Sequence, residues 1–336
     1  MKLLVTGGCG FIGSNFIKWL LAARRDISVT NLDVLTYAGN LENLKELESE
    51  GRYRFVRGSI GDDRLATGLV AGVDGVINFA AESHVDRALH GPLTFVETNV
   101  MGTAVLLEAA RNAKVRRFLQ VSTDEVYGSL PPEGYFTETT PLDPSSAYSA
   151  SKAGADLLVL AYQRTFGMDV VVTRSSNNYG PYQHPEKFIP LFVSNALEGK
   201  KCPLYGDGMN IRDWLHVRDN ARGILLAFEK GRSGQVYNIG GGNERPNKEV
   251  AGKILRLCGR DESLIEYVKD RPGHDKRYAL DSRKVRDELG WQPEVTFDEG
   301  LAETVAWYRA NGEWIQHVKS GEYQRYYDAH YGALRK

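Results

Sequence analysis

The chain has 336 residues, of which 42% are hydrophobic and 25% are charged, as in ordinary soluble globular proteins. This length exceeds the size at which a single hydrophobic core stops growing, so two lobes are expected. The formal net charge of −1 argues against bulk binding of nucleic acid, and any anionic ligand must be held by a local set of basic groups.

The first half of the chain alternates short apolar segments with amphipathic ones. Strands are predicted over residues 3–6, 28–32, 53–57, 75–79, 117–122 and 169–173, and helices over 14–21, 97–111 and 147–165. Near-continuous apolar strands joined by helices are typical of a parallel sheet covered on both faces. Because such crossovers are right-handed, the pattern predicts a Rossmann-type, doubly wound α/β fold.

The pattern changes after Asn177, where prolines interrupt short segments. Residues 218–229 are predicted to form a helix, and residues 235–239 a strand that returns to the main sheet. We therefore expect a Rossmann domain over residues 1–178, with a return segment at about 211–240. The rest of residues 179–336 is expected to form a smaller α/β substrate-binding lobe that is discontinuous in sequence.

Cysteine usage and hydropathy bear on the compartment. The three cysteines, Cys9, Cys202 and Cys258, are scattered and show no metal-ligand spacing, so reduced, buried thiols are expected. The sequence shows no secretory leader and no apolar stretch long enough to cross a bilayer. We expect a cytoplasmic protein with no metal site and no membrane partner.

A glycine-rich loop over residues 7–13 follows the first predicted strand. Gly7, Gly10 and Gly13 are spaced to allow a tight turn and a close approach of the backbone to a pyrophosphate at the start of the next helix. Asp33 ends the second strand about 20 residues later, where an acid accepts hydrogen bonds from the adenosine ribose. Residues 34–36 include no arginine for a 2′-phosphate, which favours NAD over NADP. The alternative is a glycine turn beside a solvated aspartate.

Tyr148 and Lys152 lie one helical turn apart in the predicted helix 147–165 and face the same side. A tyrosine pKa is ordinarily about 10, and a nearby ammonium lowers it. The pair is therefore predicted to remove a hydroxyl proton, with Lys152 also binding the nicotinamide ribose. The alternative is an exposed tyrosine beside a solvated lysine.

Two adjacent acids, Asp124 and Glu125, follow the predicted strand 117–122, at the edge of the sheet where ligands bind. Neighbours on a regular strand point to opposite faces, so the backbone must turn after Thr123 for both to reach one substrate. A neutral Asp124 can protonate a leaving hydroxyl, while an ionised Glu125 can remove a proton next to a carbonyl. Oxidation of an alcohol needs neither, so the acid pair predicts an elimination, most simply of water. The alternative is a solvated loop with one helix cap.

Several segments together carry a resemblance to a known family. They are residues 6–13, 80–87, 122–128, 177–181, 185–190, 212–215 and 270–275, with the pair Tyr148 and Lys152. They resemble the extended short-chain dehydrogenase/reductase family, in its sugar-nucleotide epimerase/dehydratase branch, and more narrowly the dTDP-glucose 4,6-dehydratases. The resemblance runs from residue 2 to about residue 310. The triplet 123–125 is what distinguishes dehydratases from the related 4-epimerases.

The resemblance implies a redox-neutral conversion of dTDP-glucose to dTDP-4-keto-6-deoxyglucose and water. Tyr148, assisted by Lys152 and Thr123, would take the proton of the 4-hydroxyl as hydride passes from C4 to NAD. Glu125 would remove the C5 hydrogen, Asp124 would protonate the departing 6-hydroxyl, and hydride would return to C6. Since there is no net redox change, NAD should stay bound. The alternatives are a sugar-nucleotide 4-epimerase and a non-enzymatic NAD sensor.

The resemblance also implies which residues hold the two ligands. The cofactor would contact Gly7, Gly10, Phe11, Ile12, Gly13, Asp33, Leu35, Thr36, Ser59, Ile60, Ala80, Ala81, Thr98, Tyr148, Lys152 and Asn178. The sugar nucleotide would contact Ser83, Thr123, Asn177, Lys187, Phe188, Pro203, Tyr205, Arg212, Asn247, Arg271 and His274. Arginine suits the diphosphate because its planar fork can bind phosphate bidentately.

Two further expectations rest on the resemblance. Ser59 stands where the family usually has an acid that contacts the adenine amino group, so this contact is expected to change while NAD binding survives. The helices 97–111 and 147–165 resemble those that form a four-helix dimer interface, so a homodimer is expected. The choice between dTDP and UDP stays open at this point.

Overall fold

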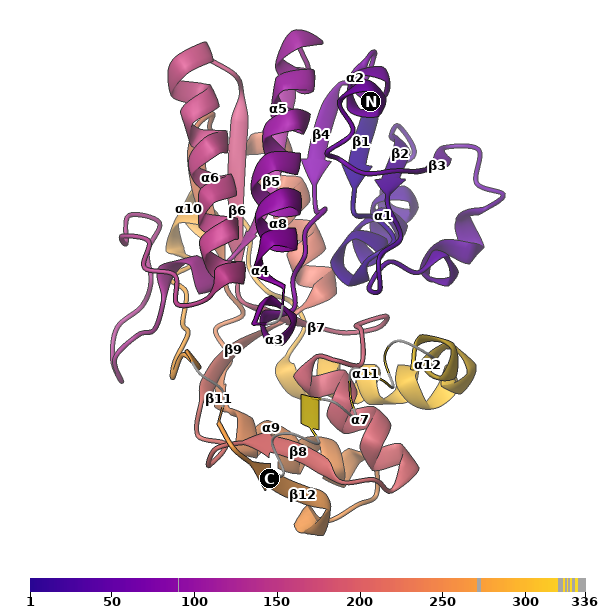
Figure 1. Cartoon of the computed structure of the whole chain (residues 1–336), viewed down its shortest axis with the longest axis vertical. Coiled ribbons are helices and arrows are strands. Elements are labelled where there is room, and N and C mark those ends of the chain that lie inside the picture. The colour runs from indigo at the N-terminus through magenta and orange to yellow at the C-terminus, as the bar shows by residue number, and fades with distance from the viewer. Residues whose placement is uncertain are drawn as a thin grey trace.

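The computed structural model describes residues 1–89, 91–270 and 273–319, together with residues 323, 325, 327, 330 and 331. Two lobes lie one above the other in Figure 1, with the main sheet in the upper lobe and two small sheets in the lower lobe. The short helix α3 (Val85–Ala88) lies between them (Figure 1).

The larger lobe is built, within the described residues, on a seven-stranded parallel sheet in the order β10-β6-β5-β4-β1-β2-β3. Every residue of β4 and β6 is buried, and the apolar residues Val76, Ile77 and 170–172 make up the first part of each strand, while polar residues end it at the carboxyl edge. The predicted doubly wound fold is confirmed, including the return of residues 235–239 to the sheet. The strands are β1 (Lys2–Thr6), β2 (Ser28–Asp33), β3 (Tyr53–Arg57), β4 (Gly75–Asn78), β5 (Arg117–Thr123), β6 (Val170–Ser175) and β10 (Gln235–Ile239).

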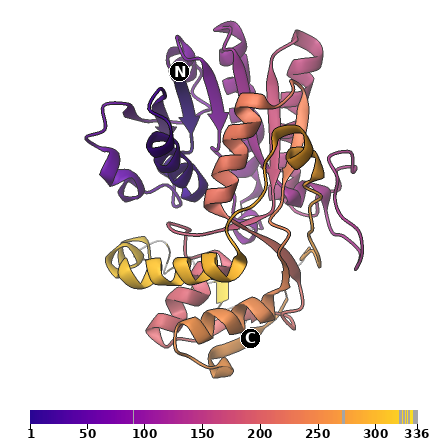
Figure 2. The same ribbon diagram turned by 180° about the vertical axis from the view of Figure 1, so that it is seen from behind.

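Helices cover both faces of this sheet. Successive strand residues point to opposite faces, and in β1 Leu3 and Val5 pack into one hydrophobic cluster while Leu4 packs into another. Figure 2 shows α8 in front of the sheet on the first of these faces. The first cluster is covered by α1 (Phe11–Ala23), α8 (Val217–Lys230) and α10 (Arg283–Leu289), and the second by α2 (Asp63–Val70), α5 (Thr103–Asn112) and α6 (Ala147–Phe166).

One of two predicted helices forms a single regular α-helix, and the other is part of a composite segment. The helix predicted over 147–165 is confirmed as α6, which begins with a capping box between Ser146 and Ser149 and ends at Gly167 with a φ of 67°. The helix predicted over 97–111 is instead part of a longer composite segment, which starts at Pro92, a residue that suits the first helical turn. Its parts are α4 (Pro92–Phe95), the π-helix η2 (Val96–Gly102) and α5.

The smaller lobe combines two small sheets with helices around a second core. Its central residues include Phe192, Ile254, Leu301 and Tyr308, all of which are fully buried. In Figure 2, α11 and α12 extend across this lobe below the main sheet. Its elements are β7 (Asn177–Tyr179), α7 (Phe188–Glu198), β8 (Cys202–Tyr205), β9 (Ile211–His216), β11 (Glu244–Pro246), α9 (Asn247–Leu257), η4 (Glu262–Leu264), β12 (Ile265–Val268), α11 (Phe297–Ala310) and α12 (Gly312–Val318).

The segment predicted to return to the main sheet at about 211–240 is divided between the lobes. Its helix α8 and strand β10 belong to the larger lobe, whereas β9 pairs with β7 and β11 in a small sheet. The predicted boundary at residue 178 falls inside β7. The division of the chain into domains therefore stays a prediction.

Two observations bear on the compartment. Among the described helices, none combines the length and the apolar character that crossing a bilayer requires. All three cysteines are free thiols; Cys9 and Cys202 are buried as predicted, whereas Cys258 is only half-buried.

Candidate active site

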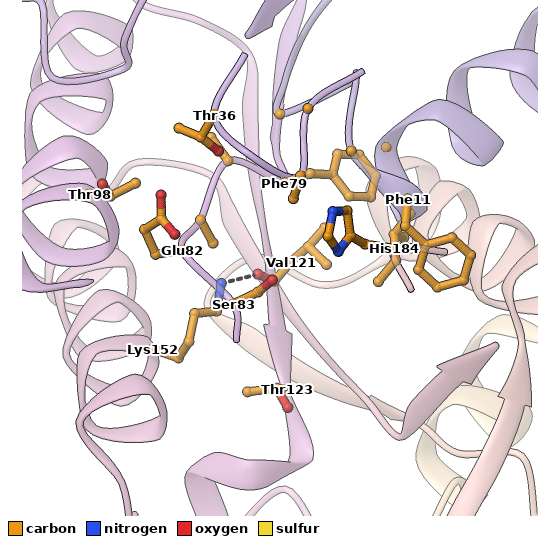
Figure 3. A pocket seen from close by; sticks show the side chains of 18 of the residues that line it. Phe11, Thr36, Phe79, Glu82, Ser83, Thr98, Val121, Thr123, Lys152 and His184 are labelled. Carbon is orange, nitrogen blue, oxygen red and sulfur yellow. Dashed lines mark hydrogen bonds between the residues drawn. The ribbon is translucent and has the colours of Figure 1, made fainter. Parts of the chain in front are cut away.

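A cavity of about 420 Å³ opens at the carboxyl ends of the central strands. Its wall includes the residues that end or follow β1, β2, β4, β5 and β6, and Figure 3 shows side chains from several of these elements converging on it. The chain order of the sheet reverses between β1 and β4. This reversal is where open parallel sheets bind their ligands.

The glycine loop between β1 and α1 forms one end of this cavity. Gly7 has a φ of 67°, and a Cβ there would lie 2.6 Å from the backbone nitrogen of Ala80. A Cβ on Gly13 would lie 2.4 Å from the carbonyl oxygen of Gly7. Both positions therefore require glycine. Among the described residues, no side chain caps the start of α1 at Gly10, so its first N–H groups face the cavity as an anion site.

Asp33 joins the glycine loop to the loop that follows β2. Its Oδ2 accepts a hydrogen bond from the Cys9 backbone N–H and its Oδ1 from that of Leu35, each at 2.8 Å. Burial raises the pKa of this carboxyl, and the two N–H groups lower it. A carboxylate so held, on a residue that lines the cavity, fits the ribose hydroxyls of a dinucleotide.

Leu35 does not form part of the cavity wall, contrary to the prediction. Its backbone has a φ of 59°, and its side chain packs against the hydrophobic cluster of β1 and α1. The left-handed turn directs the side chain into the core, while the backbone N–H is held by Asp33.

The acid pair lies where β5 turns into the short 3-10 helix η3 (Asp124–Tyr127). Thr123 is the N-cap of η3: its Oγ1 accepts a hydrogen bond from the Glu125 backbone N–H and donates one to Asp124 Oδ1, both at 3.2 Å. Gly128, with a φ of 83°, ends the turn. The expected turn after Thr123 is thus confirmed, and both acidic residues line the same cavity.

Asp124 has the surroundings of a carboxylic acid that keeps its proton. Its side chain is 1% exposed, and Oδ2 has no hydrogen-bond partner among the described residues. Burial raises its pKa well above the ordinary value, as do the charges of Glu125 and Asp213, while Arg212 and the Thr123 hydroxyl lower it. Desolvation of a carboxylate favours the neutral form. This agrees with the predicted division of roles between the two acids.

Tyr148 and Lys152 both lie on the cavity side of α6 and are buried. The expected lowering of the Tyr148 pKa does not occur in the protein alone. Burial raises it well above its ordinary value, Glu125 and Asp124 raise it further, and only the Thr123 hydroxyl lowers it. Burial also lowers the pKa of Lys152 to about 8, and its Nζ donates a hydrogen bond to the Val121 carbonyl at 2.7 Å (Figure 3).

A second cavity of about 140 Å³ adjoins the first. Among the described residues, five line both cavities: Glu125, Asn177, Asn178, Gln183 and Lys187. Arg212 lies in the wall of the second cavity with its guanidinium buried. Two carbonyl oxygens, of Ile211 and Asp275, each accept a hydrogen bond from it at 2.8 Å. A fixed positive charge at this place suits a diphosphate.

The two cavities bring together nearly all the residues predicted from the sequence. Every described residue of the predicted catalytic, cofactor and substrate sets lines one cavity or the other, except Leu35. Ser59 and Thr98 belong to the larger cavity, and Pro203, Tyr205 and His274 to the smaller one. The predicted Arg271 lies outside the described residues. The individual roles of these residues stay predictions.

Sequence reasoning missed other lining residues. Gln183 and His184 line the larger cavity, and their place between two motifs of the resemblance could have revealed them. Burial, Arg87 and Lys187 lower the pKa of His184 to about 3, so its ring is neutral. The smaller cavity also includes His84, Asp86, Glu186, Tyr278 and Tyr331. His84, Asp86 and Glu186 lie within the segments 80–87 and 185–190 that carry the resemblance, whereas Tyr278 and Tyr331 lie outside all of those segments.

Comparisons with known proteins agree with this geometry. A family model described as GDP-mannose 4,6 dehydratase matches residues 4–304. A dTDP-glucose 4,6-dehydratase of Actinoplanes sp. is 56% identical over 321 residues, which cover 94% of this chain and 99% of the relative. The crystal structure of a dTDP-glucose 4,6-dehydratase from Streptomyces venezuelae, with NAD bound, is 54% identical with a TM-score of 0.93, covering 95% of this chain and 100% of that one. A UDP-glucose 4-epimerase from Thermotoga maritima is 31% identical with a TM-score of 0.86, over 92% of this chain and 99% of its own.

Proposed function

The chain belongs to the nucleotide-sugar dehydratase family described as GDP-mannose 4,6 dehydratase, and within it to the dTDP-glucose 4,6-dehydratases; we propose that it converts dTDP-glucose to dTDP-4-keto-6-deoxyglucose and water. One observation carries the proposal. Asp124, Glu125 and Tyr148 line a single cavity beside the glycine loop. A 4-epimerase needs only the tyrosine, so the two converging acids favour dehydration.

The larger cavity fits NAD through the features that its own residues present. The glycine loop and the start of α1 would hold the pyrophosphate, Asp33 would hold the adenosine ribose, and Lys152 would bind the nicotinamide ribose. When bound, NAD would supply the acceptor for the hydride of C4 and the donor of hydride to C6, and the positive charge of its oxidised ring would favour the Tyr148 phenolate.

Tyr148 takes the proton of the 4-hydroxyl in the first step. Because burial and the two acids raise the Tyr148 pKa, the phenolate depends on positive charge and hydrogen bonds placed around it. Thr123 supplies a hydroxyl there, and Lys152 supplies a buried ammonium on the same helix face. These groups form the base of the reaction.

Elimination then uses the two acids in opposite protonation states. The 4-ketone acidifies the hydrogen on C5, and Glu125 removes it as a carboxylate. Asp124, kept neutral by burial, gives its proton to the departing 6-hydroxyl, which leaves as water. Glu125 then returns a proton to C5. The hexose stays fixed between these steps, which removes the entropic cost of a new encounter.

The smaller cavity takes the nucleotide part of the substrate. Arg212 and Lys187 provide positive charge for the diphosphate, and Tyr205, Phe188 and Pro203 provide flat and apolar walls for a base. The named activity of the relatives supports dTDP-glucose over the UDP sugar.

We also infer that the protein acts as a homodimer in the cytoplasm. Large apolar side chains lie exposed on neighbouring helices: Leu93 on α4 is 74% exposed, Met101 on η2 is 61% exposed, and Leu157 on α6 is 57% exposed. A group of such side chains is typical of a protein interface. Three free thiols suit a reducing compartment.

The proposed function is tested by incubating the purified protein separately with dTDP-glucose and UDP-glucose. We expect dTDP-glucose to give a product with the base-induced absorbance of a 4-keto sugar, at a much higher rate than UDP-glucose. Formation of the galactose epimer without a keto product would support the epimerase instead.

A further inference from the structure

Three distant segments meet at the guanidinium of Arg87, a residue of α3 that the proposed reaction does not use. Two nitrogens of Arg87 bind the carboxylate of Glu186, with Nε donating to Oε2 at 3.0 Å and Nη2 donating to Oε1. The Glu186 side chain is 1% exposed. The guanidinium also lies over the ring of Tyr37, with its carbon 3.6 Å from the ring centroid.

The residues that Arg87 joins belong to two segments that both contribute to the wall of the larger cavity. Tyr37 belongs to the loop after β2, and its neighbours Thr36, Ala38 and Gly39 line the cavity. Glu186 belongs to the segment before α7, and its neighbours His184 and Lys187 line the same cavity. Arg87 therefore ties the loop beside Asp33 to a segment of the smaller lobe.

Further contacts strengthen this bridge. The His184 ring meets the Tyr37 ring edge-on, with centroids 5.7 Å apart, and Figure 3 shows His184 projecting into the cavity. Lys187 Nζ donates a hydrogen bond to the carbonyl oxygen of Ser83 at 2.8 Å. His84 Nε2 lies 3.2 Å from the carbonyl oxygen of Glu186. The segment before α7 is thus held both to the Tyr37 loop and to residues next to α3.

We propose that Arg87 is a positioning residue that retains the dinucleotide in the enzyme between turnovers. This inference rests on the proposed function, because a redox-neutral reaction regenerates its cofactor and gains nothing from releasing it. Arg87 reaches the cofactor through Tyr37 and Glu186, by holding closed the two segments that flank the cavity. A charged planar group suits this task because it pairs with a carboxylate and stacks on a ring at the same time.

The test compares Arg87→Met with a matched control, Arg111→Met. Arg111 makes the same kind of contacts, since it pairs with Glu108 and lies over the Phe166 ring at 4.8 Å, but neither cavity includes it. Each purified protein is loaded with NAD, and NAD dissociation is followed during dilution into an NAD scavenger. We expect Arg87→Met to lose NAD at least about 10-fold faster than wild type, with kcat at saturating NAD within about threefold, and Arg111→Met to match wild type.

Equal dissociation rates for folded Arg87→Met and wild type would overturn the inference, even if the melting temperature of the variant fell, because a merely structural role would lower stability alone. If Arg87→Met does not fold, the rate of NAD release is compared between Tyr37→Leu, which removes the aromatic ring, and Tyr37→Phe, which keeps it. The leucine variant should release NAD faster and the phenylalanine variant should not; equal retention by both would also overturn the inference. Failure of wild type to dehydrate dTDP-glucose would instead refute the proposed function, since NAD retention is measured without that substrate.

Discussion

The hydroxyl of Thr123 donates a hydrogen bond to Oδ1 of Asp124 at 3.2 Å, at the point where β5 turns into η3. The Oγ1 atom of Thr123 also accepts a hydrogen bond from the backbone N–H of Glu125, again at 3.2 Å, and the Thr123 hydroxyl lowers the pKa of Tyr148. One short side chain therefore links the proposed acid, the proposed carboxylate base and the proposed phenolic base. Thr123 is thus both the N-cap of η3 and a central residue of the proposed active site.

Replacing Thr123 by valine keeps the shape of the side chain and removes this hydroxyl. We expect kcat to fall about 10- to 100-fold, because Asp124 and Tyr148 each lose a hydrogen-bonding neighbour. The free energy of unfolding should fall by about 1 kcal/mol through loss of the cap. Thr123→Ser, which restores the hydroxyl, should recover most of the activity. Steady-state kinetics and urea unfolding check both effects, and a valine variant with wild-type kcat contradicts this role.

We expect the free energy of unfolding of the protein to depend on pH through the buried carboxyl of Asp213. Asp213 is 1% exposed, its carboxylate accepts hydrogen bonds from the Gly241 and Asn243 backbones, and burial raises its pKa from 3.8 to about 6. A raised folded pKa means that the folded state holds the proton more tightly, so this stability is fully present below pH 3.8 and is lost as pH rises to about 6. Relative to Asp213→Asn, wild type should lose about 2 kcal/mol of unfolding free energy between pH 4 and 7. Urea unfolding of both proteins across this range measures the difference, and a constant difference contradicts the shift.

We expect Lys152 to lower the stability of the folded protein while it supports catalysis. Its ammonium is buried, and its pKa is lowered to about 8, so the folded protein at pH 7 carries a desolvated charge held by the Val121 carbonyl. Lys152→Met removes that charge, so the free energy of unfolding at pH 7 should rise by about 2 kcal/mol. The same variant should lose about 100-fold or more in kcat. A variant that is both less stable and fully active contradicts the account of this residue.

The proposed homodimer predicts the effect of charges on the exposed apolar group. The double variant Met101→Glu with Leu157→Glu should be a monomer at low micromolar concentration, since buried like charges oppose association. Leu257→Glu is the matched control, because Leu257 is also an exposed apolar residue, 39% exposed, but lies on α9 of the smaller lobe. Light scattering after gel filtration gives the masses. A double variant that stays dimeric would show that the interface lies elsewhere, and a monomeric wild type would refute the homodimer.

Much of the fold follows from local sequence patterns. The central strands β1 and β4 are mostly apolar because both faces of the sheet are covered, and Phe16, Ile17, Leu20 and Leu21 of the predicted helix 14–21 are buried. The glycine loop lies between β1 and α1, and Tyr148 and Lys152 lie one turn apart on α6, as their spacings predicted. Such features are set within a few residues, so they can be read without knowing the rest of the fold.

Other features depend on contacts between distant segments. The Tyr148 pKa is raised because the whole fold buries it beside two acids, which the spacing to Lys152 does not reveal. Leu35 turns into the core because of its backbone conformation and its bond to Asp33. Arg87 meets Glu186 across 99 positions of sequence. Burial and long-range pairing of this kind emerge only when the lobes are assembled.

The central claim is that Tyr148, Glu125 and Asp124 divide one reaction into oxidation and elimination within a single cavity. The most direct measurement is a single turnover of dTDP-glucose by Glu125→Gln, followed by nicotinamide absorbance and by quenched product analysis. The account predicts that reduced nicotinamide forms and accumulates while the 4-keto-6-deoxy product appears at least about 100-fold more slowly than with wild type. Product formation by Glu125→Gln at the wild-type rate, without accumulation of reduced nicotinamide, would contradict it.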